Sequence, residues 1–342
     1  MRILLVMDPF IPVPPEHYGG IERVIYDIAC QYVKMGHQVT IVAGPNSKSP
    51  DRLIIYGENG SLSPSINFKI LTDVFFILQK EIRQHDVVHN FGRLLFLLPF
   101  LKNSIRKVQT YMRYVDQKNI EWLDKLRPVN LTYTAVSDAV VNTGKTRRSN
   151  WVTIYNCAPI AQFRFKKDVP ADSYLAFLGR IERCKGLHSA IKVALLSKRK
   201  LIIAGNISDL EHEKTYFEQE IKPLIDGDQI TYIGPVDNVQ KNEFLGNASA
   251  LLTPVEWFEP FPIIIPEAYA CGTPVLGFNN GGIAEGIDEA ITGFISTNVN
   301  EMAEQVKKVS RLDRHACRLK AEISYSDINI ANDYLHVYEL DI

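Results

Sequence analysis

Two basic side chains follow an apolar, strand-like run at a spacing that suits a phosphate group. In the segment FLGRIERCKGL, Gly179 permits a sharp turn after the run, and Arg180 and Lys185 lie on the loop and at the start of the next helix. A guanidinium can bond two phosphate oxygens at once, while an ammonium supplies a mobile point charge. The pattern indicates a diphosphate site. By itself, an R-x4-K pair fits solvated cations beside a strand end at least as well.

Two carboxylates in the segment EWFEPFPIIIPEAYACGTPVLG are suited to holding sugar hydroxyls. Pro262 can begin a helix, which would place Glu267 about one and a half turns in and leave Glu259 in the preceding loop. The free N–H groups of Ile263 and Ile264 would face the same cleft. Carboxylates accept hydroxyl hydrogen bonds well, so the pair can orient a sugar. The alternative is a surface loop residue at 259 and a partner of the helix dipole at 267.

Three further segments carry candidate ligand contacts. YGGIERV opens a helix directly after the first strand, and its Gly19 and Gly20 would let the backbone approach an anion. NNGGIAEGI offers a similar turn at Gly282, with Glu285 within reach of a ligand. His89 stands at a strand end and could donate to a sugar hydroxyl or a phosphate. Each has an ordinary alternative, which is turn chemistry for the glycines, a favourable helix dipole for the glutamate and a structural role for the histidine.

The elements that must position these residues follow the pattern of parallel α/β sheets. Short, continuous apolar runs alternate with segments of helical period, as expected for strands covered on both faces. The first half predicts strands at RILLVM, QVTIVAG, DVVHN, KVQTYM, LTYTAVS and WVTIYN, and the second at SYLAFLG, KLIIAG, QITYIG, ASALLTP and TPVLGF. Residues 157–172 break the rhythm with two prolines, which predicts an interdomain linker there. Residues 325–342 have helical spacing, and the pattern leaves open whether this helix crosses back to the first half.

Composition narrows the class of protein. The 342 residues carry 38 Lys and Arg against 39 Asp and Glu, a net charge of -1, so a nucleic-acid partner is not expected. Five scattered cysteines without a C-x-x-C pair argue against a zinc site or a disulfide framework and fit a reducing compartment. The apolar stretch at the N-terminus is too short for a signal peptide or a membrane span. We therefore expect a cytoplasmic protein, with membrane-surface attachment left open.

Taken together and in order, these segments resemble the retaining family 4 glycosyltransferases of the GT-B fold over nearly the whole chain. The resemblance rests on the Gly-Gly loop, the G-R-x4-K-G segment, and the E-x7-E segment followed by A-C-G-T-P-V and G-G-I-A-E. It implies two Rossmann-like domains that face an interdomain cleft. Residues 1–160 would bind the acceptor, and residues 161–342 would bind a nucleotide-sugar donor.

The resemblance also assigns roles to residues. Arg180 and Lys185 would neutralise the donor diphosphate as it leaves, Glu259 would contact the donor sugar, Glu267 would hold the ribose hydroxyls, and His89 would lie near the reacting centre. The implied catalytic set is Arg180, Lys185, Glu259 and His89. The implied donor-binding set is Gly19, Gly20, Gly179, Phe261, Pro262, Ile263, Ile264, Glu267, Gly282 and Glu285, in part through backbone N–H groups.

The chain departs from the family pattern at three places. Pro262 stands where the family usually has glycine, which removes one N–H donor, and Phe91 stands where a second histidine is common. The strand KVQTYM also lacks the histidine often found there. The match is therefore thinner in the first half, and the acceptor stays open between a sugar, a lipid-linked molecule and a small molecule.

The implied reaction moves a sugar from a nucleoside-diphosphate sugar, most naturally of UDP or GDP, to an acceptor hydroxyl with retention at the anomeric carbon. Such a reaction would serve the biosynthesis of cell-surface polysaccharides, glycolipids or small-molecule glycosides. We see no D-x-D motif at the carboxyl end of a predicted strand and expect neither a metal nor a cofactor. The alternatives are a sugar-nucleotide epimerase of the same fold and a non-catalytic protein that binds sugar nucleotides.

Overall fold

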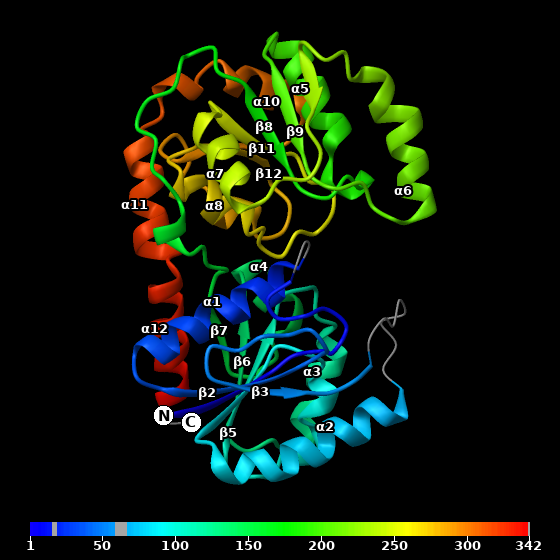
Figure 1. Ribbon diagram of the computed structural model, residues 1–342, viewed down its shortest axis with the longest axis vertical. Coiled ribbons are helices and arrows are strands. Elements are labelled where there is room, and N and C mark those ends of the chain that lie inside the picture. Colours follow the sequence, from blue (N-terminus) through cyan, green and yellow to red (C-terminus); the bar gives the residue numbers. More distant parts are fainter. Residues whose placement is uncertain (16–18, 59–66, 341–342) are drawn as a thin grey trace. The chain divides into compact units, whose positions relative to one another are not determined.

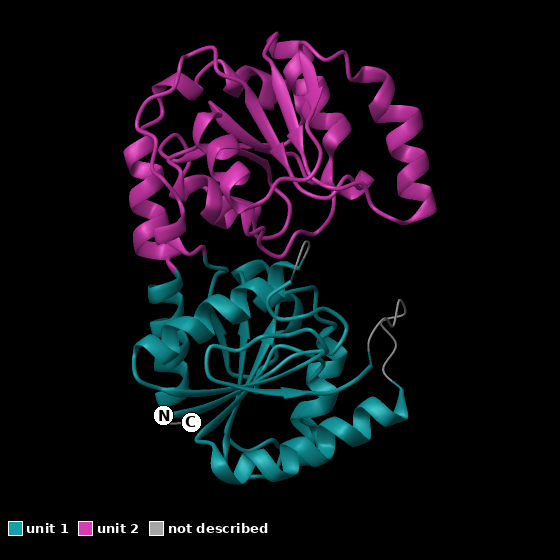
Figure 2. Ribbon diagram, in the orientation of Figure 1, with its two compact units in different colours: residues 1–157, 327–342 teal, residues 158–326 magenta. Residues whose placement is uncertain are grey.

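A computed structural model describes residues 1–15, 19–58 and 67–340. The chain divides into two compact units, of which unit 1 comprises residues 1–157 and 327–342 and unit 2 comprises residues 158–326 (Figure 2). Each unit is an α/β layer structure with helices on both faces of a parallel sheet (Figure 1). The predicted fold class, α/β with two Rossmann-like domains, is confirmed.

The sheet of unit 1 has seven parallel strands in the order β3-β2-β1-β4-β5-β6-β7. Its strands are β1 (Arg2–Val6), β2 (Gln38–Ala43), β3 (Arg52–Ile55), β4 (Val87–Asn90), β5 (Arg106–Tyr111), β6 (Leu131–Ala135) and β7 (Trp151–Thr153). Its helices are α1 (Gly20–Lys34), α2 (Phe68–Glu81), α3 (Gln117–Lys125), α4 (Asp138–Gly144) and α12 (Asp327–Glu339). Because β1 pairs with both β2 and β4, the strand order reverses between β1 and β4.

The sheet of unit 2 has six parallel strands in the order β10-β9-β8-β11-β12-β13. Its strands are β8 (Leu175–Leu178), β9 (Leu201–Ala204), β10 (Ile230–Tyr232), β11 (Ala250–Thr253), β12 (Val275–Phe278) and β13 (Gly293–Ser296). Its helices are α5 (Leu187–Ser197), α6 (Glu211–Tyr216), α7 (Asn238–Asn247), α8 (Ile264–Ala270), α9 (Ile283–Gly286), α10 (Val299–Val306) and α11 (Arg314–Ser324). Here the strand order reverses between β8 and β11, which pair with each other.

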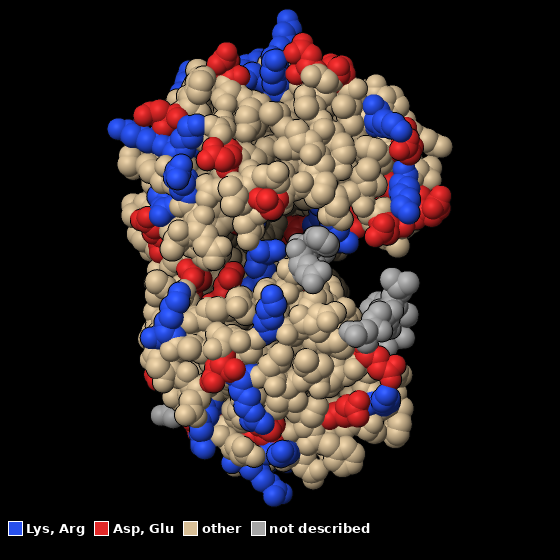
Figure 3. All heavy atoms as spheres, in the orientation of Figure 1, with Lys and Arg blue, Asp and Glu red and all other residues tan. Residues whose placement is uncertain are grey.

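Both cores form because the strands are apolar on both faces and the helices on one. The strands β1, β8, β11 and β12 are buried almost throughout. In α1 the buried side chains recur at three and four residues, including Val24, Ile25, Ile28 and Tyr32. On the face drawn in Figure 3, basic and acidic side chains are interspersed over each unit. None of the helices in the described residues is long and apolar enough to cross a bilayer.

The C-terminal helix α12 belongs to unit 1, where it packs on α1. Its anchor is Tyr338, whose hydroxyl lies 2.5 Å from Nδ1 of His89 in β4 and 3.0 Å from the hydroxyl of Tyr32 in α1. All three side chains are buried. One hydroxyl thus joins the last helix, the first helix and the centre of the sheet.

We expect Tyr338→Phe to lower the free energy of unfolding by about 1–2 kcal/mol, because it leaves a buried ring nitrogen and a buried hydroxyl without their partner. Urea denaturation measures the change. Tyr114→Phe is the matched control, since Tyr114 is 63% exposed and water can replace any hydrogen bond that its hydroxyl loses. Equal effects of the two substitutions would contradict the anchor.

Candidate functional site

The predicted phosphate and sugar segments of unit 2 meet where the strand order reverses. The loop after β8 carries Arg180 and Lys185, and the loop after β11 carries Glu259. In open parallel sheets, ligands bind outside the carboxyl ends of the strands at such a reversal. The two loops are joined by a backbone hydrogen bond of 2.9 Å from the N–H of Glu256 to the carbonyl of Cys184.

A glycine makes this close approach of the loops feasible. Gly186 follows Lys185 and has a φ of +73°, in the left-handed region that glycine adopts without strain. A Cβ at this position would lie 1.9 Å from the carbonyl oxygen of Pro254. The two residues of the K-G pair therefore have different roles. Lys185 supplies positive charge, and Gly186 lets the loop lie against the end of β11.

Lys185 and Glu259 form an ion pair across 74 residues of sequence. The ammonium lies 2.6 Å from Oε2 of the carboxylate, and the side chains are 18% and 9% exposed. Trp257 completes the arrangement. Its indole N–H donates to the same Oε2 at 2.7 Å, and its ring centre lies 5.1 Å from the ammonium. The structure thus brings two predicted residues together and adds a third.

Arg180 lies on the same loop and is about one-third exposed. Its guanidinium pairs with Oε1 of Glu182 at 2.8 Å, and that carboxylate is nearly buried. Gly179, immediately before it, is partly exposed and lies at the end of β8. Arg180 and Lys185 therefore present a partly exposed guanidinium and a partly exposed ammonium on this loop, each already facing a carboxylate.

The backbone of Glu259 is fixed by the NNGG turn after β12. The N–H of Gly282 donates to the carbonyl of Glu259 at 2.7 Å, and Asn280 donates its amide to the carbonyl of Val255 at 2.6 Å. Gly281 has a φ of +61°, and a Cβ there would lie 2.1 Å from the carbonyl oxygen of Glu259. Gly282 was predicted to bind the sugar-nucleotide donor. Because its N–H is already bonded to the carbonyl of Glu259, we assign Gly282 the role of holding the backbone of Glu259 in place. Glu285 is half-buried on α9.

Helix α8 begins two residues later than predicted. Ile264 is its first residue and Ile263 its N-cap, so Pro262 lies just outside instead of starting the helix. No protein acceptor pairs with the N–H groups of Ile263 and Ile264 among the described backbone bonds. Phe261 is buried against Tyr325, with ring centres 5.5 Å apart, so its side chain belongs to the core.

Glu267 lies in α8 and is almost buried, with Oε1 bonded to the ammonium of Lys241 from α7. That ammonium also lies 5.7 Å from the ring centre of Phe163. The sequence reasoning missed both Lys241 and Trp257. Trp257 could have been found from its position two residues before Glu259, because an indole combines an apolar ring with an N–H that needs an acceptor. Nothing in the sequence singled out Lys241.

In unit 1, Gly19 is the N-cap of α1 and Gly20 its first residue, as the Gly-Gly motif predicted for a helix start. Tyr18 of that motif lies outside the described residues. A Cβ on Gly19 would lie 2.7 Å from Cβ of Pro15 and 2.9 Å from Oε2 of Glu22. Burial, with the charge of Asp8 adding, raises the pKa of Glu22 to about 7. Gly19 is thus needed where the chain packs against a nearly buried carboxyl.

The prediction that His89 contacts the ligand is not supported by its surroundings. The side chain is fully buried, with Nε2 at 2.6 Å from Oγ1 of Thr110 and Nδ1 at the hydroxyl of Tyr338. Its ring packs 3.9 Å from that of Phe91. Burial holds its pKa well below the ordinary histidine value. With both nitrogens occupied inside the core, His89 acts as a structural residue.

The chain matches two family models that together span most of its length. Residues 18–156 match Glycosyltransferase Family 4, and residues 160–323 match Glycosyl transferases group 1. The boundary between the matches lies within a few residues of the division between the two units. The second match contains Arg180, Lys185, Glu259 and Glu267.

Among curated proteins, the chain is 30% identical to a D-inositol 3-phosphate glycosyltransferase of an Arthrobacter species over 42% of this chain and 35% of that protein. It is 30% identical to the N-acetyl-alpha-D-glucosaminyl L-malate synthase of Bacillus anthracis over 60% of this chain and 58% of that protein. The aligned region spans less than half the length of the first curated relatives that it matches.

Solved structures share the fold over nearly the whole chain. A glycosyltransferase from Rickettsia africae superposes with a TM-score of 0.76 at 19% identity, covering 99% of this chain and 97% of that one. Anabaena HepE in complex with UDP superposes with a TM-score of 0.75 at 18% identity, covering 98% and 99%.

The Lys185–Glu259 pair should couple energetically because both side chains are largely buried. We expect a double-mutant cycle of Lys185→Met and Glu259→Gln, followed by urea denaturation, to give a coupling energy of about 1 kcal/mol. The exposed pair Lys200–Asp228 is the control, at 64% and 85% side-chain exposure, and should give a coupling near zero. Additive effects at Lys185 and Glu259 would contradict the pairing.

Proposed function

The chain belongs to the glycosyltransferases that these two family models describe, and from this premise we propose that it transfers a sugar from a nucleoside-diphosphate sugar to an acceptor hydroxyl with retention of anomeric configuration. The observation that carries the proposal is the Lys185–Glu259 pair at the strand reversal of unit 2. There a cation for the leaving diphosphate and a carboxylate for sugar hydroxyls are held 2.6 Å apart.

The donor diphosphate is bound by Arg180 and Lys185. Both side chains are partly exposed at the carboxyl end of β8, and both already face carboxylates that keep them in place without a ligand. As the glycosidic bond breaks, negative charge grows on the leaving diphosphate, and preorganised cations stabilise that charge. The two residues thereby supply the charge that a divalent metal supplies in other enzymes.

Glu259 orients the donor sugar and does not attack it. Its Oε2 accepts hydrogen bonds from both Lys185 and Trp257, and a carboxylate with its charge so compensated is a weak nucleophile. This supports a same-face route to retention, in which the leaving phosphate oxygen takes the acceptor proton. Glu267 holds the ribose hydroxyls, and Lys241 keeps its carboxylate in position.

The acceptor is bound by unit 1. A cavity of about 340 Å³ opens at the carboxyl ends of β4 and β5, one strand beyond the reversal between β1 and β4 and at the carboxyl edge of its sheet, as the donor loops are in unit 2. Its walls combine apolar and basic residues, among them Leu95, Tyr114, Trp122, Arg93 and Arg113. Trp122 is 52% exposed and offers a face on which a sugar or another ring can stack.

Two other functions fit part of the site. A sugar-nucleotide epimerase of the same fold would use the same cations and carboxylates, and it would convert the donor alone to an isomer. A non-catalytic protein would bind the sugar nucleotide and leave it unchanged. The two family matches favour the transferase over both alternatives, because each of the models describes glycosyltransferases.

A panel of UDP-, GDP- and ADP-sugars should identify the donor through a rise in melting temperature, because a ligand that binds the folded state stabilises it by mass action. UDP-sugars head the panel because HepE, similar in fold, was solved with UDP. We expect Lys185→Ala to abolish the shift and the transfer, while Lys200→Ala leaves both unchanged.

The same enzyme preparation separates the alternatives. NMR of the product should show the anomeric configuration of the donor, and a metal chelator should leave the rate unchanged. An inverted product, an obligate divalent metal, or an isomer formed without acceptor would each overturn a stated part of the proposal.

Trp122→Ala should raise the KM for the acceptor about tenfold, the equivalent of roughly 1.4 kcal/mol of lost stacking, with the KM for the donor unchanged. Initial rates at varied acceptor and saturating donor measure it. The control is Leu224→Ala, an exposed apolar residue of unit 2 that should change neither constant. A change confined to the donor KM would place Trp122 outside the acceptor site.

A further inference from the structure

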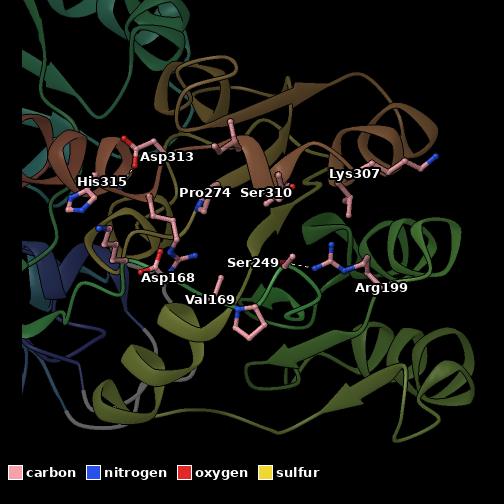
Figure 4. Close-up of a pocket in the computed structure, with 16 residues that line it drawn as sticks. Asp168, Val169, Arg199, Ser249, Pro274, Lys307, Ser310, Asp313 and His315 are labelled. Atoms are coloured by element: carbon pink, nitrogen blue, oxygen red, sulfur yellow. Dashed lines mark hydrogen bonds between the residues drawn. The ribbon is translucent and has the colours of Figure 1, made fainter.

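Besides the cavity of unit 1, the structure has a cavity in unit 2. It lies at the edge of the sheet opposite to the donor loops. Its volume is about 450 Å³, and it is lined by residues that lead into four strands and by the segment that joins α10 to α11 (Figure 4). Pro170 precedes β8, Arg199 precedes β9, Ser249 precedes β11 and Pro274 precedes β12. All four strands begin here, whereas Arg180, Lys185 and Glu259 follow the strand ends.

Arg199 is a half-buried cation in this cavity without a bonded anion. Its Nη2 donates to the carbonyl of Ser173 at 2.5 Å and to the hydroxyl of Ser249 at 3.1 Å, the bond drawn in Figure 4. Its Nε is buried and has no hydrogen-bond partner among the described residues. Burial lowers the pKa of the guanidinium, with the charge of Asp172 opposing only in part.

Arg314 is a second cation of the same kind, 8% exposed, at the start of α11. Its guanidinium bonds oxygens of five residues, all of them carbonyls or hydroxyls, from Lys166, Gly246, Ala248, Cys271 and Thr273. No carboxylate among the described residues forms a salt bridge with Arg199 or Arg314. Arg314 donates to the carbonyl of Ala248, and Arg199 donates to the hydroxyl of Ser249. The two guanidiniums therefore bind neighbouring residues of the chain.

This arrangement has an electrostatic cost that an anion would offset. A cation removed from water is costly unless it is paired, and a buried donor without an acceptor adds to that cost. The remaining charged residues of the wall form no salt bridge with the guanidiniums among the described residues. Asp168 is a carboxylate of the wall whose charge acts on Arg314, but burial outweighs this effect and lowers the pKa of that guanidinium. Lys167 adds positive charge, Asp313 caps α11 by accepting from the N–H of His315, and Lys307 points away from the cavity in Figure 4 and pairs with Glu304.

We propose that this cavity is a binding site for a small molecule bearing a phosphate group, separate from the donor site. The Arg199 guanidinium, whose Nε is unbonded within the described part of the chain, can bond phosphate oxygens, and Arg314, whose donors are largely committed to neutral oxygens, adds positive charge beside it. The cavity is larger than inorganic phosphate requires and falls within the range of small-ligand sites. Its apolar wall, which includes Val169, Val306 and Leu312, accommodates an organic portion, so a phosphate ester is favoured over the free ion.

The site is distinct from the donor site by its position in the sheet. The four residues of β8 separate the two edges, roughly 13 Å at about 3.3 Å per residue. A ligand in the cavity therefore cannot contact the donor loops directly. Binding in the cavity should survive the loss of Lys185, which distinguishes this proposal from the proposed function.

Isothermal titration calorimetry of the full chain with glucose 1-phosphate, inorganic phosphate and glucose tests the proposal. The background variant is Lys185→Ala, so that phosphate binding in the donor loops is suppressed. We expect glucose 1-phosphate to bind, inorganic phosphate to bind more weakly and glucose not to bind. Arg199→Met should weaken binding of glucose 1-phosphate about tenfold or more, because it removes charge-assisted hydrogen bonds.

Two further variants keep the test decisive if Arg199→Met folds poorly. Lys167→Glu reverses an exposed charge of the wall and should also weaken binding, while Lys200→Glu, next to Arg199 but outside the wall, should leave it unchanged. Absence of binding, equal binding of glucose, or binding that is lost with Lys185 and indifferent to Arg199 and Lys167 would overturn the proposal. Equal affinity for inorganic phosphate and its ester would overturn the assignment of an organic ligand.

Discussion

The ion pair between Lys185 and Glu259 is the contact on which the candidate site of unit 2 depends. It joins the loops after β8 and β11 at the reversal of strand order, and several local features exist to permit it. Gly186 lets the loop that carries Lys185 lie against the end of β11, and the turn at Gly281 packs against the backbone of Glu259. Trp257 then binds the same carboxylate oxygen. A site prepared in this way needs little rearrangement when a diphosphate and a sugar arrive, which is what electrostatic preorganisation requires.

The two edges of the same sheet treat charge differently. At the carboxyl edge, Arg180 and Lys185 each face a carboxylate, so their charges are balanced before any ligand binds. At the amino edge, Arg199 and Arg314 are held by neutral oxygens. A balanced cation can bind an anion and release it, which suits turnover. A cation that is held only by neutral oxygens is stabilised more by a bound anion, which suits a resident or regulatory ligand.

In unit 1 the residues at the ends of the central strands divide into structural and accessible ones. His89 and Tyr338 connect α12 to the sheet and make the last helix part of the first unit. The accessible surface lies beside them, at the cavity that contains Trp122 and Arg113. The departures of this half from the family pattern are consistent with that division, because Phe91, in place of a second histidine, packs on the ring of His89 instead of offering a polar group.

The sequence by itself determined the α/β class, the positions of most strands along the chain and the loops that bear the candidate donor residues, because parallel strands buried on both faces are continuous apolar runs and because turns need glycine. It did not reveal β3 and β13, which are short strands at the outer edges of their sheets. Their sequences, RLII and GFIS, are not part of a longer apolar run. Only the tertiary structure decided what individual side chains do. His89 is structural because both of its ring nitrogens are bonded inside the core, one of them to a residue 249 positions away, and Glu259 meets Lys185 across 74 residues. Such pairings follow from strand order, which a local pattern does not encode.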